Sequence, residues 1–139
     1  MASPTALPKE GLLLFRTAYP PVSRYNLALY CAGSGDLNPI HVDTDFARAS
    51  GYNDVFAHGM LIMAYLGRAL TTALPLRGLR SYGVRFVSMT QVHAAITCEG
   101  WVDVVNADYV RVKLSAIDEL GDLKLTGAAT FDAAAFPPP

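Results

Sequence analysis

The sequence of 139 residues lacks several features that mark particular classes of protein. It has two cysteines, Cys31 and Cys98, too few for a disulfide framework, so we expect buried reduced thiols in a cytoplasmic protein. Its eleven basic and twelve acidic residues nearly cancel, whereas a general nucleic-acid binder usually carries a basic excess. No apolar run reaches the roughly 18–20 residues of a membrane span, because Gly67 and Arg68 interrupt the longest candidate, residues 60–74.

The composition provides enough apolar material for a folded core. Hydrophobic residues make up 52% and charged residues 17%, which excludes disorder as the main state. Residues 1–4 do not open a basic stretch followed by an apolar one, so we expect no signal peptide. No group of cysteines and histidines has zinc-ligand spacing and no phosphate-binding loop is present, so we expect neither a metal nor a cofactor.

The first half of the chain predicts one strand and several interrupted helices. Residues 1–10 are rich in proline and small residues and are expected to be a flexible N-terminus. An apolar run over residues 12–18 predicts a strand. Ser23 then stands at a helix N-cap position, and the glycines from Gly33 onward end that helix.

Two further helices are expected before the middle of the chain. Asp43 or Thr44 can cap a short helix that Gly51 ends. The strongest helical pattern covers residues 58–74 and closes at Pro75. Its apolar residues occupy most of the circumference, which predicts a helix buried on most sides.

The second half has the period of two that is typical of strands. The runs cover residues 79–89, 92–105, 109–117 and 123–131. Three or four of them are expected to form a meander. With the first strand they predict an α+β domain over residues 11–134, an antiparallel sheet of about five strands packed on one long helix. Residues 135–139 would form a Pro-rich tail.

A polar loop before the long helix carries two titratable side chains five positions apart. Asp36 and His41 flank the pair Asn38-Pro39, and Pro39 excludes Asn38 from the α region, so a non-helical loop is expected. Such a turn can bring the carboxylate and the imidazole to one water, which makes a usable acid–base pair near neutral pH. From composition alone, Asp36 could equally cap backbone donors in the turn.

The start of the long helix is a second candidate site. His58-Gly59-Met60 stands where backbone N–H groups are free and the helix dipole is positive. Gly59 has no side chain to keep a ligand carbonyl from its N–H, so this N–H is a candidate oxyanion donor. The alternative is a tight turn with a hydrogen-bonded histidine.

Together, residues 30–41 and 57–60 closely resemble the signature of the MaoC-like, R-specific enoyl-CoA hydratase family. The segments read Tyr-Cys-Ala-Gly-Ser-Gly-Asp-Leu-Asn-Pro-Ile-His and Ala-His-Gly-Met. The resemblance covers residues 23–75 well and continues more loosely over residues 82–86. It implies the hot-dog fold, in which a curved antiparallel sheet wraps around one long helix.

The resemblance also implies an activity and roles for individual residues. The activity is the reversible hydration of trans-2-enoyl thioesters, of CoA or an acyl carrier protein, to R-3-hydroxyacyl thioesters. Asp36 and His41 look like the family's catalytic pair, and the Gly59 N–H looks like its oxyanion donor. Positions expected to bind substrate or order the loop are Asn38, His58 and Met60. The resemblance further implies a dimer or higher oligomer with substrate entering between subunits.

Residues 88–93 depart from the Pro-Val and Gly-Asp that the family often has there, which leaves the substrate mouth and the dimer surface open. Two other functions stay open beside the hydratase. One is a hot-dog acyl-thioesterase; the other is a subunit of a hetero-oligomeric dehydratase, a heterodimer with a paralogue. The spacing of Asp36 and His41 favours the hydratase.

Overall fold

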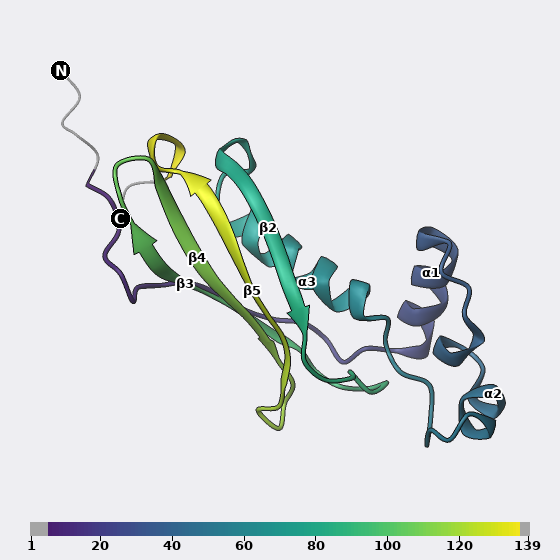
Figure 1. Ribbon diagram of the computed structural model, residues 1–139. Helices are drawn as coiled ribbons and strands as arrows, with labels where there is room; N and C mark the ends of the chain where they lie inside the picture. The colour runs from purple at the N-terminus through teal and green to yellow at the C-terminus, as the bar shows by residue number, and fades with distance from the viewer. Residues whose placement is uncertain (1–5, 137–139) are drawn as a thin grey trace.

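Five strands and three α-helices make up residues 6–136, the part of the chain that this computed structural model describes (Figure 1). The helices are α1 (Arg24–Ser34), α2 (Thr44–Ala49) and α3 (Gly59–Ala73). The strands are β1 (Leu13–Ala18), β2 (Leu79–Phe86), β3 (Thr97–Val105), β4 (Tyr109–Ile117) and β5 (Leu123–Asp132). The predicted α+β class and the five-stranded antiparallel sheet are confirmed.

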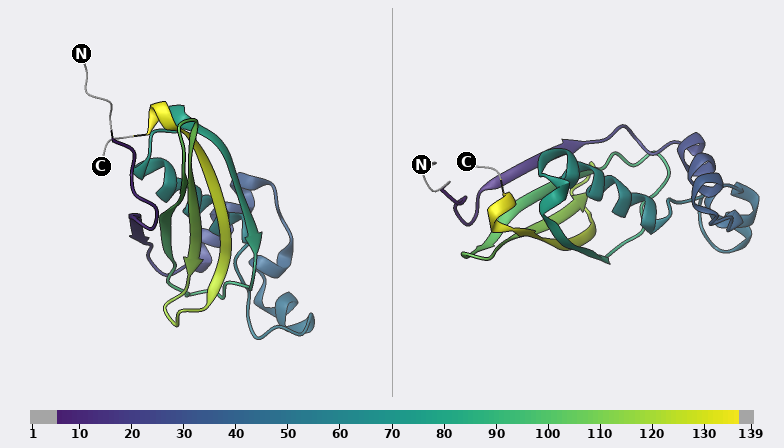
Figure 2. Two further views of the ribbon diagram at one scale, coloured as in Figure 1. Left: turned by 60° about the vertical axis from the view of Figure 1, so that its left-hand side comes forward. Right: turned by 90° about the horizontal axis from the view of Figure 1, so that it is seen from above.

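The sheet has the order β1-β3-β4-β5-β2, and every pair is antiparallel. Strands β3, β4 and β5 form the expected meander. Including β2 in it is wrong, because β2 pairs with β5 and residues 87–96 then carry the chain across to β3. Figure 2 shows the sheet curving around α3, with β1 and β2 at its two edges.

The core lies between α3 and the concave face of the sheet. Buried α3 residues are Leu61, Ile62, Leu66, Ala69 and Leu70. They meet the inward-facing residues of β4, which are Val110, Val112, Leu114 and Ala116, as the alternation of that strand predicts. The expectation that α3 is buried on most sides is wrong: Met60 is 53% exposed and Ala64 and Arg68 face solvent, because no other part of the described chain covers that side.

Helices α1 and α2 form a limb that extends beyond the end of the sheet (Figures 1 and 2). Both predicted caps are confirmed. The Ser23 hydroxyl accepts from the N–H of Asn26 at 3.0 Å, and Asp43 accepts from the N–H of Asp45 at 3.0 Å. Arg24 donates twice to Asp54, at 2.6 and 2.9 Å, which fastens α1 to the loop before α3.

Residues 1–5 of the predicted flexible N-terminus and residues 137–139 of the predicted tail lie outside the described residues. Next to them, the Gly11 N–H donates to the carbonyl of Val102 at 2.8 Å, and Phe136 is buried against Phe131. Cys31 and Cys98 are buried free thiols, as expected. Among the described residues, no helix has both the length and the apolar character to cross a membrane.

Candidate active site

The loop between α1 and α2 is built from short-range hydrogen bonds of its own side chains. The Ser34 hydroxyl accepts from the N–H of Asp36 at 3.1 Å, the Asp36 carboxylate from the N–H of Asn38 at 3.3 Å, and the Asn38 side chain from the N–H of Ile40 at 3.1 Å. Such bonds are the usual reason why serine, aspartate and asparagine favour turns. Asn38 therefore orders the loop from within.

The loop ends in a single turn of 3-10 helix, Pro39–His41. Asn38 stays outside the α region, with ψ at 120°, as Pro39 requires. The expectation of a wholly non-helical loop is nevertheless wrong, because a proline at the first helical position has its φ preset for a helix start. The turn directs His41 inward toward α3, where it is buried.

His41 is oriented by a backbone carbonyl. Its Nδ1 lies 2.7 Å from the carbonyl oxygen of Phe56. A carbonyl only accepts, so Nδ1 carries the proton and donates, which leaves Nε2 as an unprotonated acceptor in the neutral ring. The Phe56 ring also packs edge-on against the imidazole, with centroids 5.3 Å apart.

His58 connects the loop to the start of α3. His58 is 2% exposed, and its ring stacks on that of His41, with centroids 3.7 Å apart and planes at 26°. Its Nε2 donates to the backbone carbonyl of Asp36 at 3.3 Å and also contacts the Cys31 sulfur at 3.5 Å. Burial, and then the nearby charge of His41, lower the pKa of His58. His58 therefore favours the neutral form.

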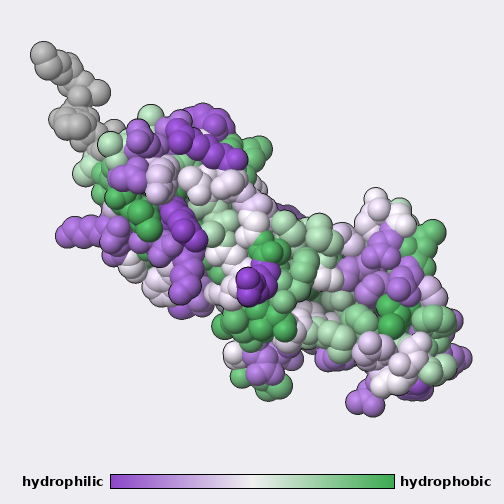
Figure 3. All heavy atoms as spheres, viewed as in Figure 1, coloured by the Kyte–Doolittle hydropathy of each residue, from purple (hydrophilic) through white to green (hydrophobic). Residues whose placement is uncertain are grey.

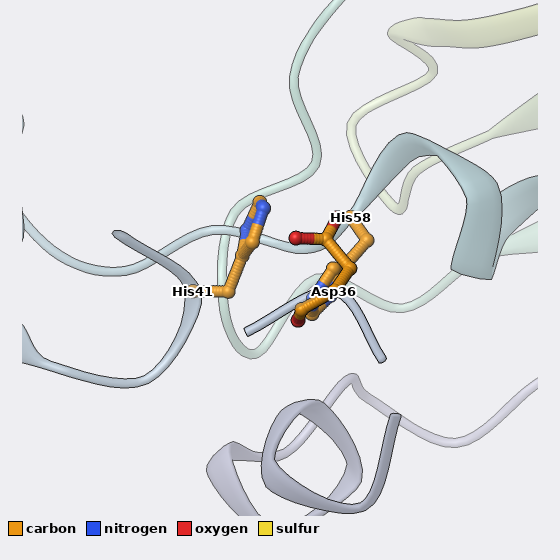
Figure 4. A group of neighbouring side chains, drawn as sticks. All are labelled: Asp36, His41 and His58. Atoms are coloured by element: carbon orange, nitrogen blue, oxygen red, sulfur yellow. The ribbon is translucent and has the colours of Figure 1, made fainter. Parts of the chain in front are cut away.

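Asp36, His41 and His58 converge, each offering one atom within 4.8 Å of the other two. Figure 4 shows the Asp36 carboxylate turned toward the His41 ring. Three such groups could hold a metal ion. A water bound between Asp36 and His41 is the other occupant that these groups suit, because a carboxylate and an unprotonated imidazole nitrogen both accept hydrogen bonds.

A cavity of about 310 Å³ opens beside these groups. Its lining includes His41 and Gly59, and its apolar wall includes Ile62, Phe86 and Leu125. The remaining lining residues are Phe56, Ala57, Val87, Ser88, Met89 and Thr90. The cavity thus joins the imidazole of one loop to the N-terminus of α3.

The other predicted site residues lie outside this lining. Asp36 is exposed next to His41, and Asn38 is exposed within the loop. Met60, in the first turn of α3, also faces solvent. His58 is buried behind His41.

Gly59 is the first residue of α3, and its N–H has no acceptor among residues 6–136. This is the position at which helical N–H groups are left free. A Cβ built on Gly59 would lie 2.9 Å from Cδ1 and Cε1 of Phe86. The glycine therefore leaves room for the Phe86 ring beside the helix start, where both residues line the cavity.

The sequence did not point to Phe56 or to the wall formed by residues 87–90. The part of Phe56 that orients His41 is its backbone carbonyl, which no residue type encodes. The wall did leave a signal, because residues 88–93 depart from the family's usual sequence. The structure places the first three of them, Ser88, Met89 and Thr90, in the cavity lining.

The chain is similar in sequence to proteins of a known family. The profile of the MaoC-like domain family matches residues 14–119. The (R)-specific enoyl-CoA hydratase of Rhodospirillum rubrum is 35% identical over 54 residues, which are 39% of this chain and 38% of that protein. Enoyl-CoA hydratase ChsH3 of Mycobacterium tuberculosis is 31% identical over 72 residues, 50% of this chain and 25% of that protein. The matched parts therefore span well under half of these curated relatives.

Solved structures match over much more of the chain. The R-hydratase PhaJ1 of Pseudomonas aeruginosa superposes with a TM-score of 0.77 at 25% identity, covering 94% of this chain and 83% of that one. The (R)-hydratase of A. caviae gives 0.79 at 23% identity, covering 89% and 96%. The ChsH1–ChsH2 complex of Mycobacterium tuberculosis gives 0.78 at 21% identity, covering 90% and 98%. The fold is the predicted hot-dog fold.

Proposed function

Because the chain belongs to the MaoC-like domain family, we propose that it catalyses the reversible hydration of trans-2-enoyl thioesters to R-3-hydroxyacyl thioesters. CoA or an acyl carrier protein would hold the acyl group. One observation carries the proposal: Asp36 and His41 converge, and His41 lines an apolar cavity that Gly59, with its free N–H, also lines. The names of the relatives in Rhodospirillum rubrum and Pseudomonas aeruginosa support the same reaction.

The reacting water would lie between the Asp36 carboxylate and Nε2 of His41. Both groups accept hydrogen bonds, so they orient the two protons of the water and leave an oxygen lone pair free to attack. The bond from Nδ1 of His41 to the carbonyl of Phe56 fixes the required tautomer. One member of the pair removes a proton as the water oxygen bonds to Cβ. The pair then returns a proton to Cα, so the sum is the addition of one water.

The Gly59 N–H would stabilise the charge that this attack produces. As water adds to Cβ, the π electrons move toward the thioester oxygen and give an enolate. A donor at the positive end of α3, facing a cavity with an apolar wall, is well placed to bind that oxygen. Losing one such donor typically costs about 10²–10³ in rate.

We also propose that the protein works as a homodimer or higher oligomer, or as a heterodimer with a paralogue. Three features of residues 6–136 support it: the side of α3 that these residues leave uncovered, the limb of α1 and α2 beyond the sheet, and the outer edges of β1 and β2, which pair with no other strand among them. Exposed apolar residues along this limb and helix include Tyr25, Leu29 and Met60, and Figure 3 shows hydrophobic residues at the surface of the limb. Sedimentation should show a dimer or larger, and an active monomer at micromolar concentration would contradict the proposal.

The test of the reaction separates a hydratase from a thioesterase. Crotonyl-CoA, or a longer enoyl-CoA, should lose its enoyl absorbance without releasing thiol, and chiral analysis should find the R-3-hydroxyacyl product. Saturated acyl-CoA should be inert, because only the conjugated enoyl group can pass the arriving charge to the oxygen. The same assays are run on Asp36→Asn, which removes the carboxylate charge and should lower the rate of hydration. Stoichiometric thiol release from saturated substrates, abolished by this substitution, would establish the thioesterase instead.

A further inference from the structure

A buried ion pair lies next to the cavity wall and has no part in the reaction. Nζ of Lys124, in β5, is 3.0 Å from Oδ2 of Asp118, in the turn after β4. Their side chains are only 8% and 9% exposed, against 49% and 42% for the pair of Arg80 and Asp132. The alternation of β5 puts Lys124 on the face opposite Leu125, which predicts a solvent-exposed lysine. Burying a charged pair costs desolvation, so its place here calls for a reason.

Asp118 is held rigidly by its own turn. Oδ1 accepts from the N–H groups of Leu120 at 3.0 Å and Asp122 at 2.9 Å, which leaves Oδ2 to Lys124. Burial raises the pKa of Asp118, but the bonds from Lys124, Asp122 and Leu120 outweigh this, so the pKa lies below its ordinary value. Asp118 is thus a fixed anion to which Lys124 is attached.

Lys124 in turn holds the cavity wall. Its Nζ donates to the carbonyl of Met89 at 3.1 Å, and its own carbonyl accepts from the N–H of Val87 at 2.9 Å. Between them, the Ser88 hydroxyl donates to the carbonyl of Leu123 at 2.7 Å. Val87 and Met89 are 50% and 44% exposed, so little apolar burial fixes this segment. Hydrogen bonds to β5 therefore contribute much of what holds residues 87–89 in place.

The same wall is bonded to the frame of His41. The Ala57 N–H donates to the carbonyl of Thr90 at 2.8 Å. The preceding residue, Phe56, supplies the carbonyl that orients His41. A displacement of residues 87–90 would therefore alter the cavity. It would also reach the His41 imidazole through Ala57 and the adjacent Phe56.

We propose that the Asp118–Lys124 pair is a positioning device that fixes the wall of residues 87–90 and so determines which acyl groups the cavity accepts. The proposal rests on the proposed function for its substrate class. Lys124 touches no reacting atom; it acts through the carbonyl of Met89. The pair is thereby distinguished from a stabilising surface bridge, which would leave acyl selectivity unchanged.

The test compares Lys124→Met with Arg80→Met, which breaks the exposed pair between β2 and β5. In Lys124→Met, amide hydrogen exchange over residues 86–91 should rise at least about tenfold, because local openings become easier. The ratio of kcat/KM for an eight-carbon to a four-carbon enoyl-CoA should rise at least about tenfold, mainly through KM, because a loosened wall admits longer chains. Arg80→Met should leave both quantities unchanged.

Each outcome decides the proposal. Unchanged exchange and an unchanged substrate ratio in folded Lys124→Met overturn it, while a wild-type protein that hydrates crotonyl-CoA leaves the proposed function intact. If the wild type hydrates no enoyl-CoA, the proposed function fails, and exchange together with the binding of saturated acyl-CoA of graded length still tests the wall. If Lys124→Met does not fold, Asp118→Asn, which keeps an oxygen in place, is read in the same way.

Discussion

His58 should make the protein lose stability in mild acid. Its side chain is 2% exposed, and burial, followed by the charge of His41, lowers its pKa below the ordinary 6.5. Below about pH 6.5 the unfolded chain therefore binds a proton at His58, whereas the folded chain stays unprotonated there until the pH is lower. Stability present at neutral pH is lost as the pH falls from 6.5 toward the lowered pKa. For one proton the slope is at most about 1.4 kcal/mol per pH unit.

Over the window from pH 6.5 to 5 this amounts to at most about 2 kcal/mol. Three carboxylates have pKa values below the ordinary value, namely Asp54, Asp118 and Asp132. The stability that they contribute is therefore lost only at more acidic pH. The window therefore reports mainly on histidine. His58→Gln, which keeps a donor for the carbonyl of Asp36 but does not titrate, should flatten the curve.

The assay is urea unfolding at half-unit steps from pH 7.5 to 5.0. The matched control is His93→Gln, because His93 is exposed in the folded chain and its ring meets solvent in both states. The wild type and the control should fall together, and His58→Gln should fall less. An equal slope in all three proteins would refute the assignment of a buried, neutral His58.

The remaining predictions concern the candidate site and a thiol. Asp36→Asn and His41→Ala should each lower kcat at least about 10²-fold without loss of fold, the usual contribution of acid–base groups; hydration near the wild-type rate would contradict the pair. Gly59→Val should abolish turnover without changing the oligomeric state, because its Cβ would lie 2.9 Å from the Phe86 ring and force it to move; turnover that persists would place the oxyanion elsewhere. Burial raises the pKa of Cys98 to about 12, so native protein at pH 8 should resist iodoacetamide there, as peptide mass analysis would show. Rapid alkylation before denaturation would mean that the core opens.

Local chemistry made much of the fold predictable. Ser23 and Asp43 cap their helices because a cap needs one side chain and the amides that directly follow it. The strand Tyr109–Ile117 was bounded correctly because one of its faces is wholly buried, which enforces strict alternation. Where both partners of an interaction lie within a few residues, the sequence contains the whole cause.

The surroundings of each element were less predictable. The apolar circumference of α3 predicts burial on most sides, yet Met60 is exposed, because the pattern records which surfaces are apolar and not what covers them. The order of the strands in the sheet was also not predictable from the local sequence. Nothing local to β2 distinguishes β3 from β5 as its neighbour, since that choice depends on where residues 87–96 cross the sheet.

In the candidate site, too, contacts between residues close in sequence were predictable and contacts between distant residues were not. Asp36 and His41 are five residues apart, so a turn of known chemistry suffices to predict that they meet. Lys124 and Met89 are 35 residues apart, and the acceptor is a backbone carbonyl that any residue would supply. The alternation of β5 even predicts the wrong environment for Lys124. It follows that a motif predicts the proposed reaction more readily than its substrate: a short loop can hold the groups that would act on water, whereas distant strands build the wall that we propose selects the acyl chain.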